Sequence, residues 1–410
     1  MAQGLPCTSG SSVSDWLMQL KDGGGQFRAM LNASGDGFRH TIREICQQPP
    51  TWAETARHLK KSRGVVASSL APCQRIVLTG SGSSQYAGEC AATALERDLR
   101  RPVVVARGGD LLLKRRASVA GEPTLVVSLA RSGQSPESAA VVETLLETEP
   151  RTEHLIVTCN AEGKLAKAFA GQSRVHVIAL DPQVNDRSLV MTSSFTNLVL
   201  GARFLGWAEK ADEFVAMVDQ LDLAGRRFLA KWPDRLGAWV SGDVRRMVFL
   251  GSGGRFGACR ESALKVLEMT GGKVASMAQT YLGLRHGPMS FIDERTLVVC
   301  YLSSDPLIRN YERDLILELN AKRLGARKLI AGVGDPGAGL CHERDLAIPY
   351  EAPEDTEDDN LALLDVAIAQ ILGFYRCLEE GLQPDSPSVD GVISRVVGEF
   401  RIHGALETAS

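Results

Sequence analysis

The chain lacks the sequence features of membrane proteins and of nucleic-acid-binding proteins. No uninterrupted apolar run approaches the roughly 20 residues that a bilayer requires, and no basic segment followed by an apolar core opens the sequence. No basic run is longer than Lys114-Arg115-Arg116, and the formal net charge is −3. We therefore expect neither a nucleic acid nor a membrane as partner, and we expect a cytoplasmic protein that binds a small molecule.

The chain also lacks the cysteine patterns of disulfide and zinc frameworks. Its nine cysteines are an odd number and include no Cys-x-x-Cys pair. This pattern predicts buried thiols in a reducing compartment, and it predicts no metal site. The chain is long and apolar enough for two domains. Its 410 residues with 44% hydrophobic side chains can form two cores.

Two serine-rich turns in the first half each follow a short apolar run. Residues 79–84 follow the run 75–78, and residues 129–135 follow the run 124–127. Such runs are typical of buried parallel strands, and a turn between strand and helix points N–H groups and hydroxyls at an anion. A plain tight turn explains one of them but not both, so we predict a phosphate site. The candidate phosphate-binding residues are Ser81, Ser83, Ser84, Ser132, Gln134 and Ser135.

The pattern occurs a second time, at a nearly constant offset. Residues 246–254 correspond to the first strand and turn, and residues 296–299 correspond to 124–127. Two distant elements at one offset predict two copies of one α/β unit. The second copy has Asp305 and Pro306 in place of the second serine-rich turn, and a carboxylate with a proline makes a poor phosphate site. Phosphate binding is therefore expected in the first half and chemistry in the second.

The chain is expected to be α/β, with a doubly wound parallel sheet flanked by helices in each unit. The helix over 361–372 is apolar on nearly every side, so we expect it to be buried between the units or in a subunit interface. The tail over 392–403 resumes an apolar pattern and is expected to lie against something. The expected boundaries are a helical N-terminal segment over 1–50, a phosphate-binding unit over 51–210, a catalytic unit over 215–383 and a tail closing the site over 384–410.

Charged residues on one predicted helix are the main candidates for proton transfer. Glu261, Lys265 and Glu268 share one face of the helix over 257–270, which Gly271 and Gly272 end. An exposed face with stabilising ion pairs is one reading. In the other, the helix C-terminus and partial burial let Glu268 accept and return a proton near neutral pH, and Lys265 tunes it or holds a substrate hydroxyl.

Two histidines and one hydroxyl-rich segment complete the candidates. His286 lies in the Gly/Pro-bounded loop 281–288, where it could move protons, and His403 lies in the tail. Thr192 and Ser193 follow the strand predicted at 175–180, so their hydroxyls either face a ligand or cap the next helix.

These motifs together resemble those of tandem sugar isomerase (SIS) domain proteins, in particular the tagatose-6-phosphate ketose/aldose isomerase group, also described as galactosamine-6-phosphate deaminase/isomerase. The resemblance runs from about residue 40 to the end. It implies two tandem flavodoxin-like SIS domains with a helical N-terminal cap. The motifs that carry it are Gly-Ser-Gly-Ser-Ser (80–84), Ser-Gly-Gln-Ser-Pro-Glu-Ser (132–138), Leu-Lys-x-Leu-Glu-Met-Thr (264–270) and Leu-Arg-His-Gly-Pro (284–288).

The resemblance implies conversion of a 2-amino-hexose 6-phosphate, with galactosamine-6-phosphate favoured, to a ketose 6-phosphate and ammonia, without metal or cofactor. Glu268 would move the proton between C2 and C1, beside Lys265, while His286 opens the ring. Arg131, Thr192 and Ser193 would bind the sugar. A homodimer or higher oligomer is implied, in which the partner subunit could supply His286.

Departures and rivals remain open at this point. The related isomerase half of glucosamine-6-phosphate synthase uses a lysine of its tail on the sugar, but here no lysine follows residue 384. Arg401 or His403 would then take this role, or the sugar is activated in another way. We expect no counterpart of the glutaminase half of that synthase, so glutamine is not the evident nitrogen source. The alternatives are a simple aldose/ketose isomerase, a non-catalytic sugar-phosphate sensor and a nucleotide-dependent oxidoreductase; the last is disfavoured because the second strand leads into Ala106-Arg107 without an acidic residue.

Overall fold

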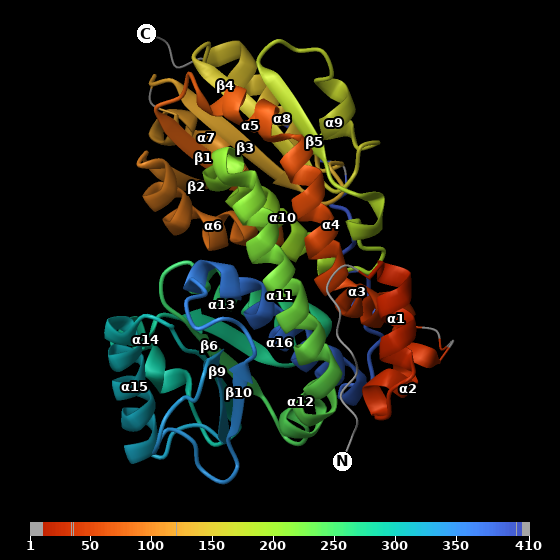
Figure 1. The fold of residues 1–410 in the computed structure, drawn as a ribbon, viewed down its shortest axis with the longest axis vertical. Coiled ribbons are helices and arrows are strands. Elements are labelled where there is room, and N and C mark those ends of the chain that lie inside the picture. The colour runs from red at the N-terminus through yellow and green to blue at the C-terminus, as the bar shows by residue number, and fades with distance from the viewer. Residues whose placement is uncertain (1–10, 34, 36, 120, 399, 404–410) are drawn as a thin grey trace. The chain divides into compact units, whose positions relative to one another are not determined.

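The computed structural model describes residues 11–403 except 34, 36, 120 and 399, and the side chains of 115–117 are also left aside. The chain divides into two compact units that each contain one parallel sheet (Figure 1). Unit 1 takes residues 1–53, 186–193 and 216–392, and unit 2 takes residues 54–185, 194–215 and 393–410. The N-terminal helical segment therefore groups with the second sheet, and the end of the tail groups with the first.

Unit 2 contains the first sheet, whose strand order is β2-β1-β3-β4-β5. All its strand pairs are parallel, and Val77 at the centre pairs with Val104 on one side and Val126 on the other. Its strands are β1 (Arg75–Gly80), β2 (Val103–Arg107), β3 (Thr124–Ala130), β4 (Thr152–Thr158) and β5 (Val175–Ala179). Its helices between strands are α6 (Ser83–Leu99), α7 (Gly108–Ser118), α8 (Pro136–Thr148) and α9 (Lys164–Ala168).

Unit 1 contains the second sheet, whose order β7-β6-β8-β9-β10 is equivalent to that of the first. This order is the flavodoxin-like one, as predicted, and ligands of such sheets bind where the strand order reverses. The strands are β6 (Arg246–Leu250), β7 (Ala275–Gln279), β8 (Thr296–Tyr301), β9 (Arg327–Val333) and β10 (Leu346–Tyr350). The helices between and after them are α13 (Arg255–Met269), α14 (Tyr281–Leu284), α15 (Pro306–Ala321) and α16 (Asp358–Glu379).

The remaining helices precede the sheets or connect them along the chain. Trp16 and Phe27 of the N-terminal helices are fully buried, so this segment is part of a core. These helices are α1 (Val13–Lys21), α2 (Gln26–Asn32), α3 (Arg39–Cys46), α4 (Gln48–Lys61), α5 (Arg63–Leu70), α10 (Ser193–Arg203), α11 (Ala211–Lys231) and α12 (Pro233–Val240), with short 3₁₀ turns at Pro182–Val184, Phe204–Lys210 and Pro288–Phe291.

The apolar helix α16 is the central helix of unit 1. It packs against α3, α12 and α13, which all belong to the same unit. Among the described residues it is the one helix with the length and composition of a membrane span, yet 94% of its most apolar window is buried inside the protein. The helix α16 is thus buried within one unit, whereas we expected it to be buried between the units or in a subunit interface.

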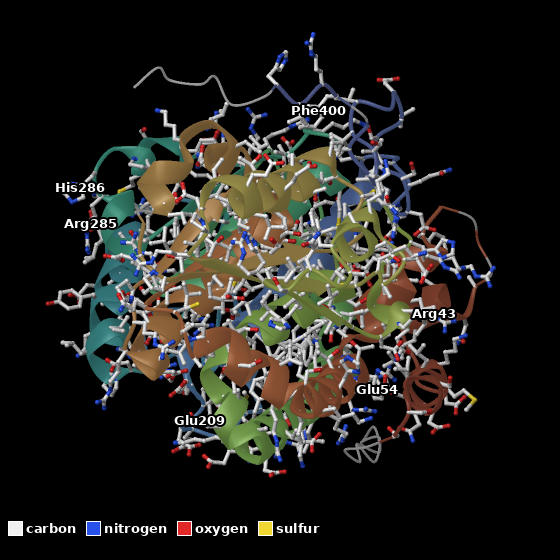
Figure 2. All side chains as sticks on the ribbon, turned by 90° about the horizontal axis from the view of Figure 1, so that it is seen from above. Arg43, Glu54, Glu209, Arg285, His286 and Phe400 are labelled. Carbon is white, nitrogen blue, oxygen red and sulfur yellow. The ribbon has the colours of Figure 1, made fainter. Side chains whose placement is uncertain are left out.

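The end of the tail is held by polar contacts and not by apolar packing. The guanidinium of Arg131 donates to the backbone carbonyl of Arg395, and the guanidinium of Arg395 donates to Asn185 Oδ1 at 2.8 Å. Val397 is half exposed, as is Phe400, which Figure 2 labels at the surface. About half of these two side chains is thus exposed in this chain, and the expectation that the tail lies against something stays a prediction.

Candidate functional site

Three charged side chains meet on the second half of α13. The Nζ atom of Lys265 lies 3.3 Å from Oε1 of Glu261 and 2.6 Å from Oε2 of Glu268. Residues three and four apart share a face of a helix, which is why this spacing brings the groups together. The side chains of Glu261 and Lys265 are fully buried, whereas 23% of the Glu268 side chain is exposed. The predicted convergence is confirmed, and an exposed ion-pair face is the wrong reading of it.

Lys265 is positively charged because of its two acidic neighbours. Burial lowers the pKa of Lys265, but the carboxylates of Glu261 and Glu268 outweigh burial and raise that pKa above its ordinary value. Lys265 is therefore an ammonium group at neutral pH, and a protonated amine is no nucleophile. It lies 2.6 Å from Glu268, the one partly exposed member of the cluster.

Two features fix the position of α13 within unit 1. At its start, the guanidinium of Arg255 donates to both carboxylate oxygens of Asp365 on α16, at 2.7 and 2.6 Å, and both side chains are fully buried. Near its end, Gly373 of α16 faces Met269, and a Cβ on Gly373 would lie only 2.8 Å from the Met269 sulfur. The helix that carries Glu268 is thus clamped to its neighbour at both ends.

The C-terminus of α13 is closed by two glycines with positive φ. Gly271 has φ +57° and Gly272 has φ +79°, a region that side chains with a Cβ disfavour. The Gly272 N–H donates to the carbonyl of Leu267 at 2.9 Å, as in a helix C-cap. Glu268 therefore lies in the last turn, where the helix dipole disfavours a negative charge.

In unit 2, the first serine-rich turn connects β1 to α6. A Cβ on Gly80 would lie 2.7 Å from the Ser84 Cβ, so the turn requires glycine there. Gly82 has φ +57°, and the Ser84 N–H donates to the Ser81 carbonyl at 3.2 Å. Ser81 is exposed, whereas Ser83 and Ser84 are buried in the first turn of α6. This is the helix N-terminus at which a phosphate site is predicted.

The second serine-rich turn connects β3 to α8. The Gln134 N–H donates to the Ser132 hydroxyl at 3.3 Å, and α8 begins at Pro136 directly after Ser135. The side chains of Ser132, Gln134 and Ser135 are half-buried. Because β1 and β3 are neighbouring parallel strands, the two turns lie at the same edge of the sheet, where its strand order reverses. Arg131 is turned to the tail carbonyl described above.

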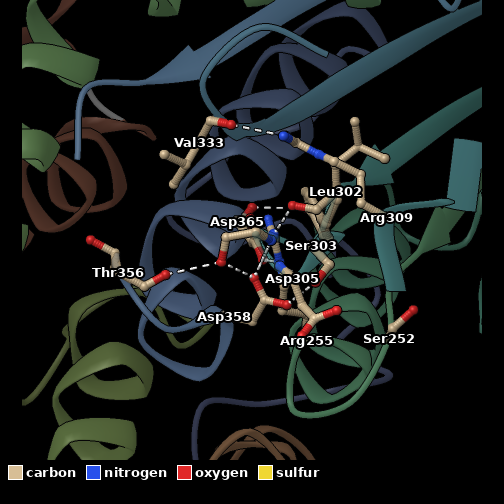
Figure 3. Close-up of polar contacts among 12 residues, drawn as sticks. Ser252, Arg255, Leu302, Ser303, Asp305, Arg309, Val333, Thr356, Asp358 and Asp365 are labelled. Carbon is tan, nitrogen blue, oxygen red and sulfur yellow. Dashed lines mark hydrogen bonds and ion pairs between the residues drawn. The ribbon is translucent and has the colours of Figure 1, made fainter. Parts of the chain in front are cut away.

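The equivalent edge of unit 1 is filled by carboxylates of the chain itself (Figure 3). Glu312 accepts from the Ser252 hydroxyl and from the Ser303 N–H, both at 2.7 Å. Asp358 accepts from the Ser304 N–H at 2.7 Å, from the Ser304 hydroxyl at 2.8 Å and from the Ser303 hydroxyl. These are the donors that an anion would use, and in this copy they already donate to carboxylates of the chain.

The two candidate histidines are both exposed. His286 follows α14 and is labelled at the surface in Figure 2, next to Arg285, which donates to Glu318 at 2.7 Å. Its backbone N–H donates to the Gly283 carbonyl, and its ring makes no hydrogen bond with any described residue. His403 is exposed in the tail. The structure brings neither ring into contact with the Glu261–Lys265–Glu268 cluster.

Thr192 and Ser193 are fully buried in unit 1. The Thr192 N–H donates to Asp186 Oδ2 at 2.7 Å, and the Ser193 hydroxyl donates to Asp186 Oδ1 at 2.5 Å. Gln47 Nε2 also donates to the Ser193 hydroxyl, at 2.9 Å. These contacts are those of a cap at the start of α10, so sugar binding by the two residues stays a prediction without support from the geometry.

Sequence reasoning missed Glu44, a buried carboxylate of α3. It accepts hydrogen bonds from the Arg187 and Ser188 N–H groups and from the Ser188 hydroxyl. Burial raises the pKa of Glu44 to about 7, and the nearby Asp186 carboxylate adds to this effect. Nothing in the pattern of α3 marks Glu44 as buried, because its partners lie more than a hundred residues further along the chain.

The described residues hold no group of three or more His, Cys, Asp or Glu side chains that could bind a metal ion. No disulfide joins the eight described cysteines, and all are buried except the half-buried Cys341. Cys7 lies outside the described residues. Burial of these thiols agrees with the prediction made from the cysteine spacing.

The fold and the two serine-rich turns define the class of protein. The family model of the SIS domain matches residues 69–200, a range that includes β1, β3 and both turns. The class is therefore that of SIS-domain proteins, with two sheets of flavodoxin-like order.

Similar proteins cover nearly the whole chain. AgaS of Streptomyces coelicolor is 39% identical over 376 residues, which are 90% of this chain and 96% of that protein. D-galactosamine-6-phosphate deaminase AgaS of Shewanella sp. strain ANA-3 is 33% identical, over 88% of this chain and 91% of the relative. The crystal structure of tagatose-6-phosphate ketose/aldose isomerase from Escherichia coli matches with a TM-score of 0.78 at 30% identity, over 86% of this chain and 95% of that chain. The chain belongs to this AgaS family of SIS-domain enzymes.

Proposed function

We propose that the protein is an amino-sugar phosphate deaminase/isomerase that converts galactosamine-6-phosphate and water to tagatose-6-phosphate and ammonia. The observation that carries the proposal is the partly exposed carboxylate of Glu268, held 2.6 Å from the buried ammonium of Lys265 at the end of α13. The family relatives named as D-galactosamine-6-phosphate deaminases support the choice of substrate.

Proton transfer is the task of Glu268. Its carboxylate removes the C2 proton of the open-chain amino sugar, which gives an enolamine, and returns a proton at C1. The resulting C2 imine adds water and releases ammonia, so the nitrogen that leaves is the one the substrate carried. One base near neutral pH suffices for this chemistry. Lys265, charged and buried, positions the base and does not form an adduct.

Phosphate binding is the task of unit 2. The Ser84, Ser132 and Ser135 hydroxyls and the N–H groups of their turns offer neutral donors to a phosphate dianion. The described acidic groups at the equivalent edge of unit 1 offer repulsion instead. We therefore assign the phosphate to the first half of the chain and proton transfer to the second.

A homo-oligomer is part of the proposal. The side chains of Leu282, Leu307 and Tyr311 on α14 and α15 are half exposed or more, and His286 is exposed in the loop after α14. Apolar side chains gathered on neighbouring helices are typical of an interface with a second chain. A second copy covering this face would surround His286, which opens the sugar ring in this proposal.

The decisive experiment measures ammonia release and ketose 6-phosphate formation from galactosamine-6-phosphate and from glucosamine-6-phosphate. The variants are Glu268→Gln, which keeps the shape of the side chain, and Glu351→Gln, a matched surface control in the same unit. Removal of the base should reduce kcat by about 10³-fold or more, whereas the control stays within twofold. Ammonia release by Glu268→Gln at the rate of the control would disprove the role of Glu268.

The same assay separates the alternatives. Interconversion of tagatose-6-phosphate with its aldose, without ammonia from either amino sugar, would show a simple isomerase, the activity named for the Escherichia coli structure. Binding of sugar phosphate without turnover in either assay would show a sensor. Ammonia from glucosamine-6-phosphate alone would keep the reaction and change the sugar.

A further inference from the structure

The N-terminal helices of unit 1 line a half-open cavity that the proposed reaction does not use. Its volume is about 340 Å³, within the range of small-ligand pockets. It lies among α1, α2 and α3, in a segment that precedes both sheets. Its floor is apolar, formed by Leu17, Leu31 and Ile42, which are all buried.

Three cationic side chains line this cavity, and none of the described residues that line it is acidic. Lys21 ends α1, and Arg39 and Arg43 lie one helical turn apart on the same face of α3. Within the described chain, the charged groups of these residues make no hydrogen bond and no ion pair. Arg43 stands at the surface in Figure 2. Like charges four residues apart on a helix repel each other, so an anion bound there would relieve a repulsion that the free protein retains.

The acidic groups that the structure describes near these helices are engaged elsewhere or do not line the cavity. Asp15 is hydrogen-bonded to the Ser12 hydroxyl at 2.8 Å, and Asp22 follows α1 without lining the cavity. Asp385 accepts from the N–H groups of His40 and Thr41 at the start of α3. The N–H groups of His40 and Thr41 are therefore already engaged, and the cationic side chains are what the cavity offers.

We propose that this cavity is a binding site for a small organic phosphate that carries an apolar group. Two arginines on one face suit bidentate recognition of a phosphate, and Lys21 adds a third positive charge. The apolar floor favours a ligand with a hydrocarbon or aromatic body over a sugar phosphate, whose hydroxyls would lose water against Leu31 and Ile42 without new partners. The site is thus distinct from the serine-rich turns of unit 2 in residues and in preferred ligand.

The test uses phenyl phosphate as probe and isothermal titration calorimetry on the full chain. To keep the predicted phosphate turns from contributing, the parent protein carries Ser84→Ala and Ser132→Ala. On this background, Arg39→Ala/Arg43→Ala removes two charges from the cavity. The matched control Lys61→Ala/Arg63→Ala removes two exposed charges elsewhere. Circular dichroism and thermal melting confirm that each variant is folded.

We expect one phenyl phosphate per parent chain, and binding about tenfold weaker or more in the Arg39→Ala/Arg43→Ala variant. The Lys61→Ala/Arg63→Ala control should bind within twofold of the parent. Phenol and inorganic phosphate should each bind far more weakly than phenyl phosphate, since each offers half of the recognition. Absence of binding to the parent, or equal affinity in the parent and the cavity variant, would overturn the proposal. If the double variant does not fold, the single variants Arg39→Gln and Arg43→Gln answer the same question.

Discussion

Lys265 lies 2.6 Å from the carboxylate of Glu268, and its own side chain has no exposed surface. A buried ammonium is stable only where opposite charges offset the loss of water. Lys265 has two such charges, because the equally buried Glu261 lies on its other side at 3.3 Å. The proton-transfer candidate is therefore the outer end of a buried charge cluster, and its position depends on two residues whose side chains have no exposed surface.

Lys265→Met should destabilise unit 1 by about 3–5 kcal/mol, because it removes the buried ammonium that faces the buried Glu261 carboxylate. The double variant Glu261→Gln/Lys265→Met removes both buried charges and should recover most of that loss. Urea unfolding of wild type, both single variants and the double variant gives the coupling energy. Simple additivity of the two single effects would show that the pair does not act as a unit.

Asp358 is predicted to act as an internal substitute for an anion. Asp358→Ala leaves the Ser304 N–H and the Ser303 hydroxyl without their acceptor, which should cost about 1–3 kcal/mol. Inorganic phosphate should then raise the melting temperature of this variant more than it raises that of wild type, because it binds the freed donors. The exposed Asp355→Ala is the control, and sodium chloride at equal ionic strength tests for a mere salt effect. Equal responses to phosphate in all three proteins would contradict the role of Asp358 as a substitute for an anion.

The sheets of both units could be predicted from the sequence because their strands are short, β-branched and separated by helical stretches. The two serine-rich turns were found for the same reason, since each directly follows a recognisable strand. The spacing of Glu261, Lys265 and Glu268 is enough to predict that they share one helix face, because this depends on the helix alone and not on the rest of the fold.

What could not be predicted depends on contacts between distant parts of the chain. Burial of α16 inside unit 1 depends on α3 and α13, which approach it only in the folded chain. Nothing in the sequence near Asp358 shows that it accepts hydrogen bonds from Ser303 and Ser304, which lie more than fifty residues earlier. The tail was expected to pack through its apolar residues, whereas its observed anchors are the polar contacts of Arg395.

Stability of unit 1 should depend on pH through Glu44. Its pKa is raised from 4.5 to about 7 by burial and by Asp186, so the folded state holds a proton more tightly than the unfolded state. The stability contributed by this protonation is present at low pH and is lost as pH rises from about 4.5 to 7. Between pH 5.5 and pH 8, wild type should therefore lose about 2 kcal/mol more stability than Glu44→Gln, which has no charge to bury. Urea unfolding at both pH values measures this difference. Identical pH dependence of the two proteins would show that Glu44 titrates normally.

His286 is predicted to act in a site completed by a second copy of the chain, because its ring is exposed and makes no hydrogen bond with any described residue. Glu268→Gln and His286→Ala should each be inactive alone. When the two variants are co-expressed with different tags, a hybrid dimer unites one intact Glu268 with the intact His286 of the other chain. Random pairing into dimers should then restore about a quarter of wild-type activity, because half of the dimers are hybrids and each hybrid has one complete site. If both residues act within one chain, the hybrid has no complete site, and activity stays at the level of the single variants. Ammonia release by the purified hybrid, compared with each variant paired with itself, distinguishes the two arrangements.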